Sequence, residues 1–395
     1  MNFLPQLHRH AWMDEEIEAF RDQARRYIER EMVPHLDGWR RQGFIPREVW
    51  RPFAELGLLL PELPEAYGGA GANLAYQLVV LDELTRAEVP ANTAVHSIAT
   101  HYILDYGTEA QKQQWLPRLT SGELLAGIAL TEPGCGSDLK ALRTKARQDG
   151  DHYVIDGAKT FITNGYTANL LVVAVRTGDA GSAGVSLVVL ETEGLQGFRV
   201  GRRLEKLGQH ASDTAELFFD GVRIPCAQLL GTQEGQGFKQ LMSQLPYERL
   251  MLAVPAAAVI ERAVELTVDY TRQRKAFGQT VFDFQNTRFK LAECATLAHV
   301  VRSFVNDCVQ RLLDGTLDDE AAYMAKWWCT EQQCKVTDEC LQLFGGYGYM
   351  AEYPIARAWA DARVQRIYGG TTEIMKEIVA RHILDAPSPR KSPST

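Results

Sequence analysis

Residues 170–190 read LLVVAVRTGDAGSAGVSLVVL, and this stretch sets the middle of the chain apart from its flanks. It holds two runs rich in β-branched residues, Leu170–Val175 and Val185–Leu190, separated by Gly, Asp and Ser. Runs of six residues with this composition are typical of strands, and the polar segment between them is typical of a turn.

Similar runs surround this stretch. Tyr153–Ile155 and Glu216–Phe219 have strand composition, and we expect Asp156-Gly157 and Asp220-Gly221 to form turns after them. Short strands at this spacing indicate a small antiparallel barrel or sandwich, which we place at residues 126–237.

Helical spacing flanks the β-rich segment on both sides. Between residues 14 and 125, apolar side chains such as Ile17, Phe20 and Ala24 recur every three or four positions. Long amphipathic patterns follow the β-rich segment and indicate a bundle; they lie at about 240–272, 283–313, 317–343 and 371–384. The predicted fold class is therefore α+β, mostly α. Its parts are an N-terminal helical domain (1–125), a β domain (126–237), a C-terminal helical domain (238–385) and a disordered tail (386–395).

The composition disfavours several classes of function. The 395 residues carry a net charge of −8, whereas nucleic-acid binding needs clustered positive charge. No apolar run approaches the ~20 residues that span a bilayer. The seven cysteines form no C-x-x-C pair and the nine histidines are scattered, so we expect reduced thiols and no metal site. The N-terminus has no signal-peptide pattern, which predicts a cytoplasmic location of bacterial type, or the mitochondrial matrix if a transit peptide has been removed.

A glycine-containing segment begins the β domain. In Leu130–Asp138 (LTEPGCGSD), two glycines keep backbone N–H groups accessible, and Thr131 and Ser137 add hydroxyls. The segment can equally be a Gly-rich turn without a ligand. It is not a dinucleotide fingerprint, because no strand–GxGxxG–helix unit surrounds it.

A second segment, Lys159–Gly165 (KTFITNG), also has two interpretations. It can be a strand that ends in an Asn-Gly turn, or it can present Phe161 and Thr163 to a flat aromatic ligand.

Three segments of the C-terminal part place basic residues or glycines at helix ends. Arg272–Gly278 (RQRKAFG) is either a solvated helix end or a pyrophosphate contact. Gln342–Tyr349 (QLFGGYGY) is either a C-cap and turn or a close backbone approach to a ligand. Tyr368–Glu373 (YGGTTE) leads into the last helix, with Thr371 or Thr372 as its N-cap, and such a helix N-terminus suits a diphosphate.

In this order and spacing, the five segments resemble the acyl-CoA dehydrogenase family over about residues 14–385. The first and fourth segments are similar to the two signature motifs of that family. The C-terminal half resembles its long-chain branch most, in Leu245–Leu250 (LPYERL), Arg274–Gly278 and Asp361–Glu377.

The resemblance implies an N-terminal helical domain, a middle β-barrel and a C-terminal four-helix bundle. It also implies FAD bound without a Rossmann unit, an acyl-CoA substrate, electron-transfer flavoprotein as the partner, and a homotetramer built as a dimer of dimers. The implied cofactor-binding residues are Ile128, Leu130, Thr131, Ser137, Phe161 and Thr163 at the isoalloxazine, Arg274, Phe277, Gln285, Gln342, Gly345 and Gly346 at a neighbouring subunit's FAD, and Thr371 and Glu373 from the FAD's own subunit. The implied substrate-binding residues are Ser137, Arg249, Gly369 and Gly370.

The catalytic base is where this sequence departs from much of the family. Many members carry a Glu directly after the Tyr of the last motif, but here that position is Gly369. The long-chain and isovaleryl branches carry the Glu on the first bundle helix, before an Arg, and this sequence has Glu248 followed by Arg249. The resemblance therefore implies that Glu248 is the base. The backbone N–H of Gly369 is then expected to bind the thioester carbonyl oxygen, where negative charge develops.

Three alternatives remain at this point. The protein can be a dehydrogenase of the isovaleryl or another branched-chain type, since the position of the base is shared with that branch. It can be an acyl-CoA oxidase, although such relatives are generally longer. It can also be a non-catalytic binding or assembly protein derived from the family, against which the intact flavin motifs and Glu248 argue. Straight medium-to-long acyl chains are favoured.

Overall fold

The computed structural model describes residues 12–90, 92–179 and 181–385. The predicted disordered tail, 386–395, lies outside the described residues. The helices are α1 (Glu15–Tyr27), α2 (Leu36–Gln42), α3 (Trp50–Glu55), α4 (Leu74–Arg86), α5 (Asn92–Tyr106), α6 (Glu109–Thr120), α7 (Gly237–Gln273), α8 (Gln285–Leu313), α9 (Asp319–Phe344), α10 (Pro354–Arg363) and α11 (Thr372–Asp385). The strands are β1 (Ala126–Ala129), β2 (Lys145–Asp149), β3 (His152–Thr163), β4 (Leu170–Arg176), β5 (Val185–Glu191), β6 (Phe198–Arg203), β7 (Thr214–Pro225), β8 (Lys275–Ala276) and β9 (Gln279–Thr280).

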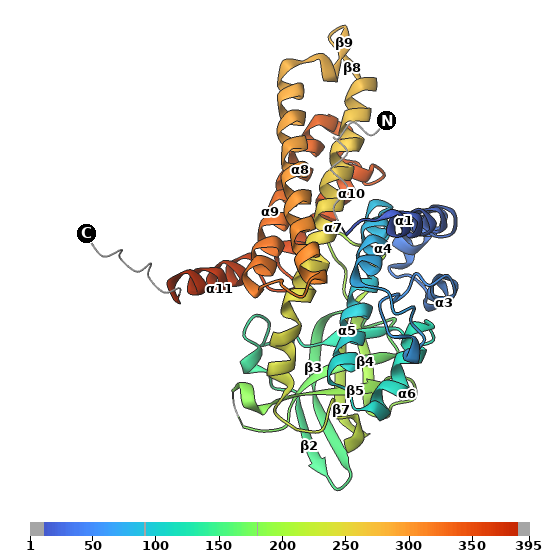
Figure 1. Ribbon diagram of the computed structural model, residues 1–395, viewed down its shortest axis with the longest axis vertical. Helices are drawn as coiled ribbons and strands as arrows, with labels where there is room; N and C mark the ends of the chain where they lie inside the picture. The colour runs from blue at the N-terminus through green and yellow to red at the C-terminus, as the bar shows by residue number, and fades with distance from the viewer. Residues whose placement is uncertain (1–11, 91, 180, 386–395) are drawn as a thin grey trace, which may run out of the picture.

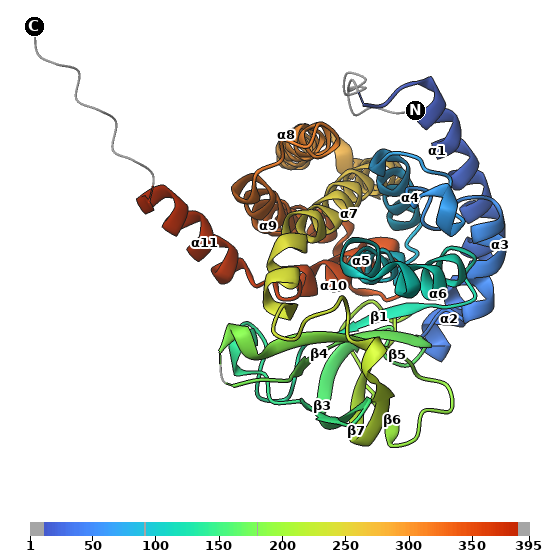
Figure 2. The same cartoon turned by 60° about the horizontal axis from the view of Figure 1, so that its bottom comes forward.

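The fold is mostly helical, with one large β-sheet between two helical parts, as the sequence predicted. Helix α5 lies against the sheet, α4 packs against α7, and α7, α8 and α9 run together as the long helices of the C-terminal part (Figure 1). Helix α11 extends away from the body of the molecule (Figures 1 and 2). Among the described residues, no helix combines the length and the apolar character needed to span a membrane.

The sheet has seven strands in the order β1-β4-β2-β3-β7-β6, with β5 paired to β4. Strands β4 and β5 cross over β3, β6 and β7, so the sheet is strongly curved (Figure 2). The antiparallel expectation holds for β2–β3, β3–β7, β4–β5 and β6–β7. It fails for β1, which enters from α6 and pairs in parallel with β4, Ala126 opposite Leu170.

Strand β4 explains why the run that begins at residue 170 is apolar at every position. Leu170, Val172 and Ala174 pack into the core shared with the helices. Leu171 and Val173 point the other way, into the core enclosed by the sheet. A strand covered on both faces needs no polar alternation.

The predicted turns at Asp156-Gly157 and Asp220-Gly221 are wrong. Both pairs lie inside long strands, β3 and β7, which face each other at this point. The pairing shifts register between Ile155 and Gly157, and the backbone N–H of Gly221 donates to Asp156 Oδ1 at 2.8 Å. Here the Asp-Gly pairs mark a bulge, in which a local kink is absorbed without ending the strand.

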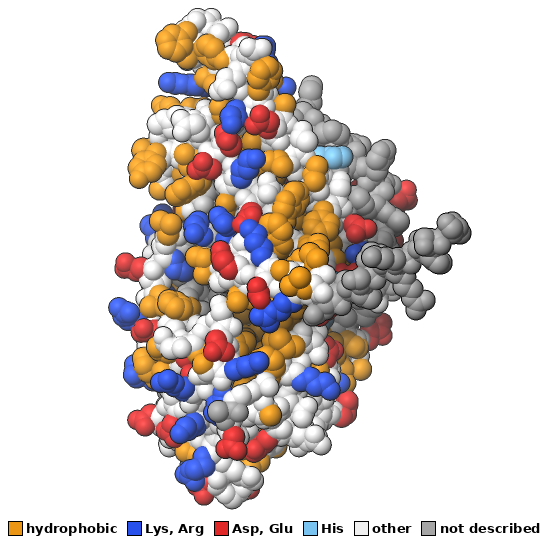
Figure 3. Space-filling view, turned by 90° about the vertical axis from the view of Figure 1, so that its left-hand side faces the viewer, with side chains coloured by type: hydrophobic (Ala, Val, Ile, Leu, Met, Phe, Trp, Pro, Cys, Tyr) orange, Lys and Arg blue, Asp and Glu red, His pale blue; other side chains and the backbone are white. Residues whose placement is uncertain are grey.

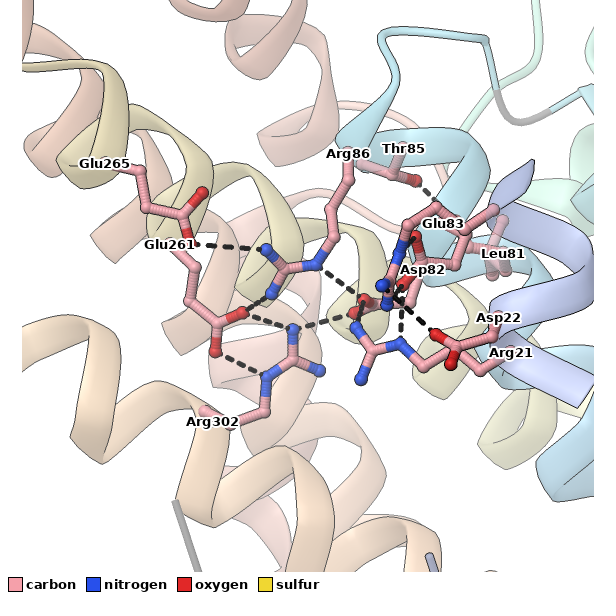
Figure 4. Close-up of polar contacts among 11 residues, drawn as sticks. Arg21, Asp22, Leu81, Asp82, Glu83, Thr85, Arg86, Glu261, Glu265 and Arg302 are labelled. Atoms are coloured by element: carbon pink, nitrogen blue, oxygen red, sulfur yellow. Dashed lines mark hydrogen bonds and ion pairs between the residues drawn. The ribbon is translucent and has the colours of Figure 1, made fainter. Parts of the chain in front are cut away.

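An ionic cluster joins the N-terminal helices to the long helices (Figure 4). It consists of three carboxylates, Asp82, Glu83 and Glu261, and four arginines, Arg21, Arg25, Arg86 and Arg302. Arg302 on α8 donates to Asp82 on α4 and to Glu261 on α7, each at 2.7 Å. Burial alone would raise the pKa of Asp82, but Arg302, Arg86 and Arg21 outweigh it and hold that pKa below its usual range.

His96 joins α5 to the start of the sheet. The backbone N–H of Ala126 donates to His96 Nδ1 at 3.0 Å, and Nε2 lies 3.2 Å from the carbonyl oxygen of Leu119, to which it donates. Because one ring nitrogen accepts and the other donates, the imidazole is neutral. Burial lowers the pKa of His96 to about 4, although the Leu119 carbonyl raises it.

We expect acidification to destabilise the protein through His96. Between its ordinary pKa of 6.5 and the folded value of about 4, only the unfolded chain binds this proton. The stabilisation that neutral His96 provides is therefore complete above pH 6.5. The free energy of unfolding falls by about 3 kcal/mol as the pH drops from 6.5 to about 4. Urea unfolding at pH 7.0, 5.5 and 4.5 measures it. His96→Gln should have a lower free energy of unfolding at pH 7, but that free energy should fall less on acidification than in the wild type. An equal fall in both proteins would contradict the role of His96.

Candidate active site

A cavity of about 270 Å³ lies where the N-terminal helices, the sheet and α7 meet. Eight of the residues predicted for the flavin, the substrate or the base line it: Ile128, Leu130, Thr131, Phe161, Thr163, Glu248, Arg249 and Gly369. The first five come from β1, the loop after it and the end of β3, whereas Glu248 and Arg249 come from α7. Segments far apart in the sequence thus form one hollow.

Glu248 points from α7 toward α5. Its Oε1 accepts a hydrogen bond from the hydroxyl of Tyr102 at 2.7 Å, and its Oε2 lies 3.3 Å from Arg249 Nη1. Arg249 is itself buried, and its Nε has no hydrogen-bond partner among the described residues. Tyr102 was not predicted from the sequence, although the neighbouring apolar residues Ile103 and Leu104 could have indicated a buried position.

The loop before α11 closes one side of the cavity. Gly369 and Gly370 have φ values of +59° and +84°, which glycine adopts readily. A Cβ at position 369 would lie 2.3 Å from Leu252 Cδ1, so a side chain there is opposed by both backbone and packing. The carbonyl oxygen of Gly370 accepts a hydrogen bond from Nζ of Lys326 on α9.

Lys326 is a second site residue that the sequence analysis missed. Its side chain is fully buried, and burial together with the charge of Arg249 lowers its pKa to about 7. The available signal was a lysine at a position where the helical spacing of Ala322, Ala325 and Cys329 predicts an apolar residue.

The first Gly-containing segment is held by a buried ion pair. Lys159 Nζ donates to Glu132 Oε1 at 2.8 Å and to the carbonyl oxygen of Leu130 at 3.0 Å. The backbone N–H of Thr160 donates to the carbonyl oxygen of Thr131 at 2.9 Å, which joins the two segments beside the cavity. Ser137 lies farther along this loop, exposed and outside the lining of the cavity.

Phe161 has an unusual conformation at the end of β3. Its φ is +59°, and 67% of the residue is exposed although it is a large apolar side chain. It sits where the pairing of β3 with β7 shifts register, between Lys159 and Ile162. Bulky residues are uncommon in this backbone region, and such strain concentrates at functional sites.

The other predicted cofactor residues gather at the far end of the long helices. Arg274, Phe277, Gln285, Gln342, Gly345 and Gly346 lie where α7 ends, the β8–β9 hairpin turns and α9 ends. The guanidinium of Arg274 lies 5.7 Å from the ring centroid of Tyr347, and the rings of Tyr270 and Phe344 stack at 4.1 Å. Residues 248 and 274 are about 39 Å apart along α7, at 1.5 Å for each of 26 residues, so this group lies far from the cavity.

The N-cap prediction for the last helix is confirmed for Thr371, whose Oγ1 accepts from the backbone N–H of Ile374 at 3.3 Å. Glu373 follows on the exposed side of the first turn. Within the described ranges, no group of three or more His, Cys, Asp or Glu side chains could hold a metal ion.

Fold and site together define a class of protein. Three family models match the chain: the N-terminal domain of acyl-CoA dehydrogenases over residues 14–123, the middle domain over 127–222 and the C-terminal domain over 235–384. The chain belongs to the acyl-CoA dehydrogenase family. It is a FAD-dependent enzyme that dehydrogenates acyl-CoA thioesters, as the sequence predicted.

Its relatives include long-chain enzymes. The mouse mitochondrial long-chain specific acyl-CoA dehydrogenase is 45% identical over 374 residues, which cover 93% of this chain and 86% of that one. The crystal structure of an acyl-CoA dehydrogenase from Geobacillus kaustophilus matches with a TM-score of 0.92 at 45% identity, covering 95% of this chain and 99% of that chain. A glutaryl-CoA dehydrogenase from Mycobacterium smegmatis, solved in complex with FADH2, matches with a TM-score of 0.88 at 27% identity and covers 96% of each chain.

The residues around the cavity fit a flavin. Phe161 presents an exposed ring beside the apolar side chains of Ile128 and Leu130. A Cβ at Gly134 or Gly136 would meet nothing within 4 Å, so packing inside the chain does not account for these glycines, and their backbone is open to a ligand.

Proposed function

We propose that the enzyme oxidises long, straight-chain acyl-CoA thioesters and that Glu248 is the base that removes the α-proton. The observation that carries the proposal is the placement of the Glu248 carboxylate in a largely apolar cavity, with Arg249 beside it and a glycine at the alternative position of the base. The chemistry that FAD would supply when bound is that of an acceptor for the hydride from the β-carbon. As the Cα–H bond breaks, its proton passes to the Glu248 carboxylate and its electron pair becomes part of the new Cα=Cβ bond.

Three carboxylates line the cavity, and their surroundings support Glu248 as the base. Glu88 is paired with Arg40 at 2.9 Å and with Arg357 at 2.7 Å. Asp361 accepts a backbone N–H from the loop after β6, which holds that loop to α10. The two guanidinium groups at Glu88 favour its charged form and so weaken it as a proton acceptor. Asp361 is engaged in holding the loop, whereas Glu248 has a single guanidinium beside it, that of Arg249 at 3.3 Å.

Long acyl chains are supported by the extent of the cavity along α7. Leu252, Pro255, Val259 and Leu266 line it beyond Glu248, and Val89, Ala94 and Ile98 line it from the N-terminal helices. Residues 248 and 266 are about 27 Å apart along the helix, at 1.5 Å for each of 18 residues. The identity with long-chain relatives supports the same substrate class.

Val259→Phe should separate long from short substrates. The added ring would enter the cavity about 17 Å along α7 from Glu248. We expect kcat/KM for palmitoyl-CoA to fall by about 10-fold or more, and that for butyryl-CoA to change little, because a blocked apolar pocket discriminates on this scale. Flavin bleaching under anaerobic conditions measures both substrates.

The matched control is Val33→Phe, the same change at an exposed position of the N-terminal part that does not line the cavity. A wild-type enzyme that bleaches fastest with isovaleryl-CoA would overturn the long-chain proposal and favour the branched-chain alternative.

We further propose that the enzyme is a homotetramer, a dimer of dimers, that passes electrons to electron-transfer flavoprotein. The far end of the long helices supports an oligomer: Phe277 at the hairpin tip is 96% exposed, and Phe289 and Tyr349 are more than half exposed. Figure 3 shows hydrophobic side chains among the charged ones on the face beside α8, α9 and α11. A neighbouring subunit that covers this end could place Arg274 at its FAD.

The electron acceptor is tested by reoxidation of the reduced enzyme. We expect electron-transfer flavoprotein to reoxidise it rapidly and air to reoxidise it slowly; fast reoxidation in air would favour an oxidase.

Arg274→Ala should weaken FAD retention. Loss of a charge-assisted diphosphate contact costs roughly 1.5–3 kcal/mol, or about 10- to 100-fold in affinity. The ratio of flavin to protein absorbance after dilution and gel filtration measures it. Arg288→Ala, an exposed arginine on α8 near Gln285, is the control. Equal flavin content in both variants would make Arg274 a solvated residue.

A further inference from the structure

The hydroxyl of Tyr102 is the shortest polar contact of Glu248. Tyr102 lies on α5, on the N-terminal side of the cavity, and is 0% exposed. We propose that Tyr102 is a positioning residue for the reaction: its hydroxyl fixes Oε1 of Glu248 and leaves Oε2 to take the α-proton. The inference rests on the proposed role of Glu248.

The two carboxylate oxygens of Glu248 differ in how firmly they are held. The Tyr102 hydroxyl donates to Oε1 at 2.7 Å, a normal length for an O–H···O⁻ bond. The Arg249 guanidinium lies 3.3 Å from Oε2, longer than the ~2.7–2.9 Å of a strong charge-assisted bond. The hydrogen bond at Oε1 restrains rotation of the carboxylate away from the cavity. Oε2, which has only the longer contact with Arg249, is then the oxygen more open to an incoming proton.

Burial makes Tyr102 a dependable donor. Removal from water raises the pKa of Tyr102 well above its ordinary value, and the charge of Glu248 raises it further. The phenol therefore stays protonated at neutral pH and can donate to the carboxylate. A buried hydroxyl also needs a partner, and Glu248 is the one that the structure records for it.

Other ionisable groups surround Glu248, and a pH experiment must hold them constant. They are Tyr247 and Arg249 on α7, Asp105 and Tyr106 on α5, Tyr323 and Lys326 on α9, and the Glu62–His101 pair behind Tyr247. Lys326, with a pKa of about 7, titrates in the range in which activity is measured. For this reason, the Tyr102 variant is compared with the wild type and with a variant of the same helix.

The test uses Tyr102→Phe as the FAD-loaded enzyme, with Tyr106→Phe as the matched control. Tyr106 lies one turn along α5, and its hydroxyl accepts from Gln244 Nε2 at 3.4 Å instead of contacting Glu248. In Tyr102→Phe we expect kcat to fall by about 10- to 100-fold, the effect of losing a hydrogen bond to a charged group, with KM changed less than kcat. The acidic limb of the kcat/KM profile should move to higher pH, because the carboxylate loses a donor that favours its charged form. Tyr106→Phe should keep the wild-type limb.

A second variant, expected to shift the acidic limb in the opposite direction, guards against a folding defect. Incorporation of 3-fluorotyrosine at position 102 keeps the shape of the side chain and makes its hydroxyl a stronger donor, so the acidic limb should move to lower pH. Limbs that stay at the wild-type position in both variants would overturn the positioning role, whatever happens to kcat. Glu248→Gln separates this failure from that of the proposed function: if Glu248→Gln keeps activity, the base is misassigned, whereas an inactive Glu248→Gln with unchanged limbs in the Tyr102 variants removes only the role of Tyr102.

Discussion

Replacement of Glu248 by Gln should lower kcat by about 10²–10⁴-fold, the usual contribution of a general base. Glutamine keeps the size of the side chain and can still accept the Tyr102 hydroxyl, so the fold and the FAD content should be unchanged. It cannot take up the α-proton, because an amide has no basic oxygen at neutral pH. Stopped-flow bleaching of the flavin with a long-chain acyl-CoA measures the chemical step directly.

Two variants make the Glu248 result specific. Glu265→Gln changes a carboxylate on the same helix that pairs with Arg86 and does not line the cavity, so it should leave turnover unchanged. Asp361→Asn tests another carboxylate of the cavity. Wild-type turnover in Glu248→Gln together with loss in Asp361→Asn would transfer the role of base to Asp361.

Replacement of Asp82 by Ala should cost about 3–5 kcal/mol of the free energy of unfolding, as expected when one partner of a buried charge network is removed. Asp82 accepts from Arg21, Arg86 and Arg302, and its side chain is 6% exposed. Without it, three guanidinium groups compete for the two remaining carboxylates of the cluster (Figure 4). Urea unfolding at pH 7 measures the loss.

Asp22→Ala is the control for the ionic cluster. Asp22 pairs with Arg25, but its side chain is 58% exposed, so the change should cost less than about 1 kcal/mol. A loss of similar size in both variants would show that burial adds nothing to these pairs. The stability that Asp82 contributes should also start to fall as the pH drops below its unfolded pKa, and it is lost fully only below its depressed folded pKa.

Sequence patterns predicted what depends on local composition. The apolar runs at β4 and β5 became buried strands, and the segments around Thr131, Phe161 and Glu248 line one cavity. Residues that act through distant partners were not predictable in this way. Tyr102 contacts Glu248 across 146 positions of sequence, and no local sequence pattern indicates that its hydroxyl makes this contact. Lys326 contacts a backbone carbonyl 44 positions away, which no local pattern encodes.

The Asp-Gly pairs show a second limit. A turn and a bulge use the same residues, because both need glycine's freedom and a carboxylate that accepts a backbone N–H. What separates them is whether the chain beyond the pair finds the same neighbouring strand again. Residues on either side of Gly157 pair with β7, and that pairing is set by tertiary structure.

The left-handed backbone at Gly369 and the methyl group of Leu252 behind it limit how a side chain could enter the cavity from the loop before α11. A Cβ at position 369 would meet Leu252 Cδ1 at 2.3 Å, so the Leu252 side chain would have to turn aside to admit a carboxylate there. Leu252 also lines the cavity, so this movement would change a wall of the pocket. A carboxylate on that loop is therefore expected to reshape the pocket as well as enter it.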